Sequence, residues 1–130
     1  MNPIKLKIKT KTQEYSIIIG SNLMSNISKI AKVNSLNFKQ CLLIIDKNIS
    51  KKIFSKIKKS LIKKNPYVYF YKANEINKNQ NHVNKILDIL LNKNFSREDC
   101  LISIGGGITG DISGFAASLF KRGLKFINIP

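Results

Sequence analysis

Apolar and polar residues alternate in two short segments near the start of the chain. Residues 4–10 read IKLKIKT and residues 14–19 read EYSIII, with a few polar residues between them. Alternation with a period of two is typical of a strand with one buried face, and a short polar connection joins antiparallel neighbours. The pattern therefore predicts a β-hairpin that ends at Gly20.

Strand-like and helix-like segments then alternate to the end of the chain. Helical spacing of apolar residues predicts helices over residues 22–33, 49–61, 82–91 and 111–122. Apolar or β-branched runs predict strands over residues 41–46, 67–71, 100–104 and 125–130. This order predicts an α/β fold: an N-terminal β-hairpin, then a doubly wound, mostly parallel Rossmann-like sheet with helices on both faces. The length of 130 residues predicts a single domain, residues 1–130.

Glycine is concentrated in one place. Five of the seven glycines lie between Gly105 and Gly114, directly after the strand predicted at 100–104. Gly105, Gly107 and Gly110 spell G-x-G-x-x-G between a strand and a helix, a context in which this pattern binds a dinucleotide. Glycines let main-chain N–H groups reach a pyrophosphate, and the next helix presents its positive end to that anion. A tight turn without ligand is the alternative, but three consecutive glycines cost much chain entropy for a mere turn.

Acidic residues are rare, and several of them lie at one predicted rim. Of seven acids, Asp46, Glu75 and Asp111 stand at or just beyond the carboxyl ends of successive predicted strands, where open α/β sheets bind ligands. Asp46 can accept hydrogen bonds from two ribose hydroxyls. A role as N-cap of the helix predicted to begin near Ile49 is an equal alternative.

The strong positive charge changes this interpretation little. The formal net charge is +16, but the lysines are scattered along the whole chain and no nucleic-acid-binding module is present. Lysine, isoleucine and asparagine all have A/T-rich codons, which accounts for the basicity without a ligand. The sequence favours a solvated basic surface and no nucleic-acid partner.

Other residue types indicate a soluble cytoplasmic protein without a membrane partner. No apolar run reaches the length of a membrane span, and the basic alternating N-terminus does not resemble a signal peptide. Cys41 and Cys100 each open a predicted strand, which favours buried apolar roles over a disulfide or metal ligation. His82 is the only histidine, and we expect it on a helix face, because one histidine is too few for a zinc site.

The last thirty residues resemble a known family. LISIGGGITGDISGFAASLFKRGLKFINIP, residues 101–130, resembles the segment of 3-dehydroquinate synthases in which GGG-x-x-GD-x-x-GF-x-A precedes RG-x-x-F and P. Glycerol dehydrogenases and iron-containing alcohol dehydrogenases share the triple glycine but usually lack the continuation and the Arg-Gly pair. Upstream, NEINK at 74–78 resembles the family's G-E-x-x-K, with Asn74 replacing glycine, and DKN at 46–48 resembles its D-x-N.

The resemblance implies a lyase of the shikimate pathway, which leads to chorismate and the aromatic amino acids. Such enzymes convert 3-deoxy-arabino-heptulosonate 7-phosphate, a sugar acid phosphate, to 3-dehydroquinate and phosphate, using NAD and a zinc or cobalt ion. The resemblance assigns NAD-binding roles to Asp46, Asn48, Glu75, Lys78, Gly106, Gly107, Ile108, Thr109, Gly110 and Asp111.

The resemblance also implies finer roles for two of these positions and for one arginine. Asp46 is expected at the adenosine ribose. Asp111 is expected at a ribose hydroxyl or the carboxamide, because its charge repels phosphate. Arg122 is expected to reach the substrate phosphate of the neighbouring subunit in a homodimer, and a solvated residue at a helix end is the alternative.

Relatives continue beyond the position of Pro130 with catalytic lysines and a helical domain that carries the metal ligands. The resemblance therefore implies that residues 1–130 supply the NAD-binding half, contain no catalytic residue and no metal ligand, and are inactive alone. Three alternatives stay open: half of a related sugar-phosphate cyclase or polyol dehydrogenase, a non-catalytic nucleotide-binding relic, and a nucleic-acid binder. The nucleic-acid binder leaves the glycine-rich rim unexplained.

Overall fold

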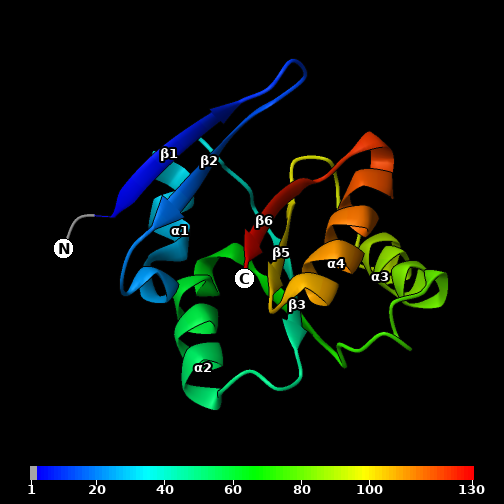
Figure 1. Cartoon of the computed structure of the whole chain (residues 1–130). Coiled ribbons are helices and arrows are strands. Elements are labelled where there is room, and N and C mark those ends of the chain that lie inside the picture. The colour runs from blue at the N-terminus through cyan, green and yellow to red at the C-terminus, as the bar shows by residue number, and fades with distance from the viewer. Residues whose placement is uncertain (1–2) are drawn as a thin grey trace.

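A computed structural model describes residues 3–130; Met1 and Asn2, which the expected single domain includes, lie outside the described residues. In chain order the elements are β1 (Ile4–Lys9), β2 (Glu14–Ile19), α1 (Ile27–Val33), β3 (Cys41–Asp46), α2 (Lys51–Ser60), β4 (Pro66–Tyr71), α3 (Gln80–Asn92), β5 (Cys100–Ile104), α4 (Gly107–Leu119) and β6 (Lys125–Ile129). Short 3-10 turns at Leu23–Asn26, Ile62–Lys64 and Phe120–Arg122 precede or follow helices. The predicted strands and helices are therefore all present (Figure 1).

The predicted hairpin is confirmed, and it has one apolar face. β1 and β2 pair antiparallel, so that Ile4 lies opposite Ile19, Leu6 opposite Ile17, and Ile8 opposite Tyr15. Directly paired residues share a face of the ladder. The other face carries lysines 5, 7 and 9. In Figure 1 the hairpin (blue) stands apart from the main sheet, and most of its apolar face is exposed.

The remaining strands form the expected parallel, doubly wound sheet. The strand order is β4-β3-β5-β6, and each neighbouring pair is parallel. α1 and α2 cover one face and α3 and α4 the other (Figure 1). The chain leaves β3 toward β4 and later returns to place β5 on the opposite side of β3. The connections therefore change direction between β3 and β5.

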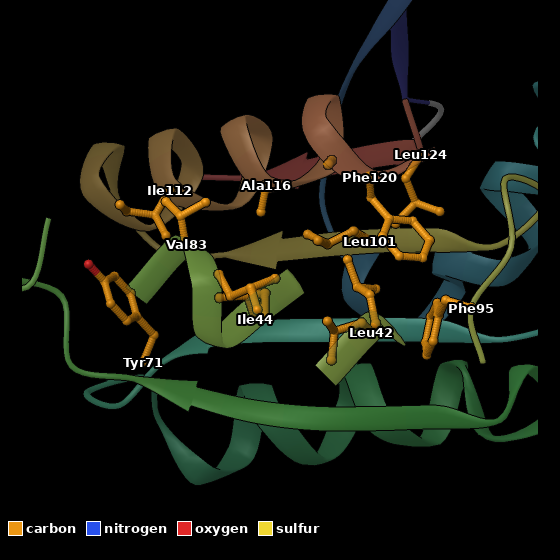
Figure 2. Packing of buried hydrophobic residues seen from close by; sticks show 13 residues of the cluster. Leu42, Ile44, Tyr71, Val83, Phe95, Leu101, Ile112, Ala116, Phe120 and Leu124 are labelled. Carbon is orange, nitrogen blue, oxygen red and sulfur yellow. The ribbon is translucent and has the colours of Figure 1, made fainter. Parts of the chain in front are cut away.

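Alternate side chains of the central strands enter two separate cores. Leu42 and Ile44 of β3 and Leu101 of β5 pack against α3 and α4, where Figure 2 shows them beneath Ala116 and Phe120. The opposite core contains the other side chains of these two strands and apolar residues of α1 and α2: Ile27, Ala31, Cys41, Leu43, Ile45, Ile57, Leu61, Cys100, Ile102 and Ile104. Burial on both faces explains why β3 and β5 read as continuous apolar runs.

Both cysteines are free and fully buried in that core, which confirms the apolar role expected for them. Cys41 and Cys100 are register partners on β3 and β5. Burial raises the pKa of the Cys41 thiol from 9.0 to about 12 and raises the pKa of the Cys100 thiol as well, because a thiolate in the core would lose its hydration.

The starts of two helices differ most from the sequence prediction, and the other helix boundaries differ by at most three residues. The segment predicted as helix over residues 22–33 begins as a 3-10 turn and becomes α-helical only at Ile27. α4 begins at Gly107 rather than Asp111, so that part of the glycine-rich segment is helical. Because glycine has a low helix propensity, the sequence does not indicate that α4 starts at Gly107. Within the described residues, no helix is long and apolar enough to cross a membrane.

Candidate functional site

The carboxyl ends of β3 and β5 lie side by side at the point where the connections change direction. Ligands of open α/β sheets bind in the crevice formed at such a point. Asp46 ends β3, and Gly105 follows β5. A Cβ built on Gly105 would stand 3.0 Å from the Cβ of Asp46 and 2.9 Å from Oγ1 of Thr109. Gly105 also has a φ of +152°, so packing and backbone conformation both require glycine at this position.

The other glycines of the segment fall into two classes. A Cβ on Gly110 would stand 3.1 Å from Oδ1 of Asn128, and one on Gly114 would stand 3.4 Å from the ring of Phe126. These two glycines let α4 lie close to β6. By contrast, a Cβ on Gly106 or Gly107 would meet nothing within 4 Å. Nothing in the described chain therefore explains the absence of side chains at Gly106 and Gly107.

The start of α4 faces the same open space. Gly106 is the N-cap residue and supplies no side-chain hydrogen bond, and the first intrahelical bond at this end runs from the Gly110 N–H to the Gly106 carbonyl. The N–H groups of Gly107, Ile108 and Thr109 lie in the first turn, where helices leave such donors without an intrahelical partner. A helix N-terminus with free N–H donors attracts anions. At the N-terminus of α4 no capping side chain occupies these donors.

Thr109 lies beneath the glycine turn. Its side chain is fully buried against Gly105, and its hydroxyl has no hydrogen-bond partner within the described residues. The buried hydroxyls of Ser103 and Ser113 also have no such partner. Thr109 is therefore packed inside the fold, where its side chain supports the turn.

Asp46 does not cap α2, so the helix-cap alternative for this residue is wrong. Ser50 is the N-cap, because its side chain accepts a hydrogen bond from the N–H of Ile53. The Oδ1 atom of Asp46 accepts a hydrogen bond of 3.0 Å from the N–H of Asn48. This bond fixes the carboxylate at the end of β3 and places Asn48 in the turn that follows.

The segment between β4 and α3 brings Lys78 to α4. Nζ of Lys78 lies 3.2 Å from Oδ2 of Asp111, so two sequence-predicted site residues from separate segments form an ion pair. Glu75 lies in the same segment and is exposed. The Asn74 side chain accepts a 2.8 Å hydrogen bond from the N–H of Asn77, and its φ is not positive. Asparagine therefore stabilises this turn where the family pattern has glycine.

Arg122 is separated from these residues. It follows α4 at the end opposite the glycine segment, and thirteen helical residues span about 20 Å. Lys121, Arg122 and Gly123 all have positive φ, 45°, 68° and 116°. This sharp left-handed turn leaves the Arg122 side chain exposed. The structure therefore does not bring Arg122 to the crevice of its own chain.

His82 lies half-buried on a face of α3, which confirms the expected helix-face position. Its ring contacts the buried ring of Tyr71 edge-on, and its Nδ1 lies 3.0 Å from Oδ1 of Asn79. Within residues 3–130 no group of three or more His, Cys, Asp and Glu side chains is arranged to hold a metal ion.

The sequence interpretation missed three residues around the crevice. Asn128 lies against Gly110, and Tyr71 and Asn77 hold the segment that carries Lys78. Tyr71 belongs to an aromatic strand run and Asn77 to an asparagine-rich stretch, so neither has a distinctive pattern. The sequence offered one signal: Tyr71 directly precedes the loop predicted at the rim, and Asn77 lies within that loop.

Comparisons with known proteins agree with this arrangement. Residues 68–130 match the family described as 3-dehydroquinate synthase N-terminal. A 3-dehydroquinate synthase of Pelagibacter ubique is 58% identical over 130 residues, which is 100% of this chain and 35% of that protein. The 3-dehydroquinate synthase of Clostridium botulinum is 35% identical over 97% of this chain and 36% of that protein. The chain thus spans about a third of the length of the curated relatives it matches.

Solved structures share the fold. A 2-deoxy-scyllo-inosose synthase complexed with carbaglucose-6-phosphate, NAD+ and Co2+ superposes with a TM-score of 0.85 at 20% identity, over 98% of this chain and 34% of that one. A 2-epi-5-epi-valiolone synthase from Streptomyces hygroscopicus subsp. jinggangensis, with NAD+ and Zn2+ bound, gives 0.76 at 22% identity, over 95% and 34%. The hairpin and the parallel sheet therefore occur together in larger enzymes.

Proposed function

We propose that the chain is part of a 3-dehydroquinate synthase, the family that residues 68–130 match, and that residues 1–130 form one NAD-binding domain of such an enzyme. The whole enzyme converts 3-deoxy-arabino-heptulosonate 7-phosphate to 3-dehydroquinate and phosphate. The observation that carries the proposal is the open space at Gly106 and Gly107 in front of the uncapped start of α4. Main-chain donors and a helix N-terminus together suit a diphosphate.

The residues at the crevice fit the parts of NAD. The first turn of α4, from Gly106 to Gly110, binds the diphosphate through main-chain N–H groups. The Asp46 carboxylate, fixed by its bond from Asn48, accepts hydrogen bonds from the adenosine ribose. Lys78, Glu75 and Asp111 contact the remaining polar groups of the dinucleotide, with Asp111 at a hydroxyl or amide because carboxylate and phosphate repel each other.

Bound NAD supplies a hydride acceptor for the transient oxidation of one substrate hydroxyl. The chain's own contribution is binding and orientation, and the ionisable groups of the described residues at this crevice, Asp46, Glu75, Lys78 and Asp111, are all assigned to NAD. They also offer no ligand cluster for a divalent metal, and we assign no step to one here. We therefore propose that the 130-residue chain binds NAD but does not turn over substrate alone.

We propose in addition that the domain works as a homodimer. Arg122 lies at the end of α4 that is remote from the crevice of its own chain, which supports a role for its guanidinium at the substrate phosphate of a second copy. The exposed apolar face of the hairpin, with Ile4, Leu6, Ile17 and Ile19 between 41% and 59% exposed, is the kind of surface that protein contacts cover. The free state of both cysteines supports a cytoplasmic location.

Calorimetric titration of NAD into the purified chain tests the NAD site. We expect binding in the micromolar to millimolar range that Gly107→Val and Asp111→Ala abolish. Ser118→Val, which adds a β-branched residue at the other end of α4, is the matched control and should leave binding intact. Absence of binding to a folded chain would contradict an NAD site formed by this domain alone.

A chimaeric enzyme tests the wider activity. This chain replaces the matching segment of the Pelagibacter ubique relative, and release of phosphate from the sugar acid phosphate is measured. We expect turnover that Gly107→Val removes. Binding of NAD without turnover in the chimaera would favour a non-catalytic nucleotide-binding module. Sedimentation tests the homodimer: Leu6→Lys with Ile17→Lys should dissociate it, and a chain that is monomeric at high concentration would contradict it.

A further inference from the structure

The segment between β4 and α3, residues 72–79, is held by side chains rather than by regular secondary structure. Asn77 is at the centre of these contacts. Its carbonyl accepts a 2.6 Å hydrogen bond from the hydroxyl of Tyr71, and its side-chain amide donates a 2.8 Å bond to the carbonyl of Lys72. Its main-chain N–H donates to Oδ1 of Asn74 at 2.8 Å. Three groups of one residue are therefore tied to three different neighbours.

The contact from Tyr71 is the one that links the segment to the core. The Tyr71 side chain is 1% exposed and packs among the apolar residues between the sheet and α3, where Figure 2 shows it near Val83. Only its hydroxyl leaves this core. Burial raises the pKa of Tyr71, and the neighbouring Tyr69 raises it further, so the hydroxyl keeps its proton and remains a donor at neutral pH.

The residue next to Asn77 is Lys78, whose ammonium reaches Asp111 on α4. The main-chain N–H of Lys78 bonds to the carbonyl of Glu75 at 3.3 Å, a long contact that fixes its position weakly. Asn79, on the other side, caps α3 through a bond from the N–H of His82 and donates its side-chain amide to Ile76. Lys78 thus stands between two residues that are both anchored.

We propose that the Tyr71 hydroxyl and Asn77 are positioning residues that hold the 72–79 segment so that Lys78 lies against Asp111 before the dinucleotide binds. This inference rests on the proposed NAD site and adds residues to it that touch no ligand. A loop ordered in advance loses less conformational freedom on binding, which strengthens affinity without any new contact. Tyr71 and Asn77 act on the dinucleotide only through Lys78.

Amide hydrogen exchange measured by NMR on the 130-residue chain tests the holding role without NAD. Tyr71→Phe removes the hydroxyl and keeps the ring in the core. We expect exchange at the Asn77 and Lys78 amides to accelerate about tenfold as the turn opens locally, with unchanged exchange at Ile86 and Leu90 in α3. Tyr69→Phe is the matched control, because no hydrogen bond from the Tyr69 hydroxyl occurs within residues 3–130. Unchanged exchange in Tyr71→Phe overturns the proposal.

A double-mutant cycle tests whether the hydroxyl acts through Lys78. Tyr71→Phe should weaken NAD binding about fivefold in the native background and less than about twofold when Lys78→Gln is already present. An undiminished fivefold loss in the Lys78→Gln background overturns the coupling. If the native chain is folded and binds no NAD, the proposed function of the isolated domain fails, and hydrogen exchange alone decides whether Tyr71 holds the segment.

Discussion

Gly105 and Asp46 lie so close together that a Cβ on residue 105 would stand 3.0 Å from the Cβ of Asp46. The two residues are far apart in sequence: Asp46 ends β3, and Gly105 directly follows the neighbouring strand β5. The side chain of Thr109, in the first turn of α4, also packs against Gly105. One glycine therefore joins the end of β3, the end of β5 and the start of α4.

We predict that Gly105→Ala destabilises the fold by about 2 to 3 kcal/mol, because the new Cβ meets both neighbours and the φ of +152° strains any side chain. Chemical denaturation with urea measures this change. Gly106→Ala is the matched variant: its φ of −77° suits alanine and its Cβ meets nothing within 4 Å, so stability should change by less than about 0.5 kcal/mol.

We predict that Gly106→Ala impairs NAD binding although it leaves stability almost unchanged. Gly106→Ala should fold normally and bind NAD at least about tenfold more weakly, a loss of roughly 1.4 kcal/mol, because the methyl group enters the space proposed for the diphosphate. Calorimetry on the folded variant measures the loss. Full affinity in Gly106→Ala would place the dinucleotide elsewhere.

Lys78→Gln should separate binding from stability. The Lys78 and Asp111 side chains are 41% and 65% exposed, and such pairs contribute less than about 1 kcal/mol. We therefore expect a small change in the unfolding midpoint and a roughly tenfold loss of NAD affinity. A large fall in stability with intact binding would make this ion pair structural.

Ser50→Ala and Asp46→Ala should have contrasting effects. Loss of the Ser50 cap should cost about 1 kcal/mol of stability, while NAD affinity stays unchanged. Asp46→Ala should cost less stability, because Asp46 caps no helix, and should weaken NAD binding. Thermal unfolding and calorimetry on both variants measure the contrast, and similar profiles for the two would argue against a ribose-binding role for Asp46.

The buried thiols should make the fold sensitive to alkaline pH. The pKa of Cys41 is raised from 9.0 to about 12 in the folded chain, so the unfolded chain releases this proton first. The contribution of Cys41 to stability is complete below pH 9 and is lost as the pH rises toward 12. Urea denaturation between pH 8 and 11 measures the slope, about 1.4 kcal/mol per pH unit for each such thiol above its unfolded pKa.

Cys41→Ala should flatten this slope relative to the native chain, whatever its effect on stability at neutral pH. Both native thiols should also react with Ellman's reagent at pH 8 only after unfolding, because the thiolate is the reactive form and both side chains are buried. Rapid reaction of a folded chain would contradict the packing of β3 on β5.

The buried strands were the most predictable part of the fold. β3 and β5 coincide with the apolar runs at 41–46 and 100–104, because burial on both faces favours apolar residues at successive positions, with Ser103 as the exception inside β5. The rim position of Asp46 and Asp111 followed from the same strand ends. The start of α4 was not predictable, since Gly106 and Gly107 give the helix no side-chain cap and low propensity.

Residues that act through tertiary contacts were also hidden in the sequence. The bond from Tyr71 to Asn77 spans the end of a strand and an irregular loop, and no spacing rule describes it. The separation of Arg122 from the crevice depends on the direction of α4, which becomes clear only when the helix is placed on the sheet. The sequence therefore located the rim but not the contacts that support it.

The strand order has a consequence for how the chain folds. β5 lies between β3 and β6, and its pairing with β3 joins residues about 60 positions apart, a contact whose loop closure is slow. β3 and β4 can pair earlier, because they are close in sequence. Asp46 and Gly105 meet only when β5 pairs with β3, so the crevice depends on the pairing with the largest sequence separation in the parallel sheet. A half-folded chain has no crevice, and a dinucleotide bound there would stabilise only the complete sheet.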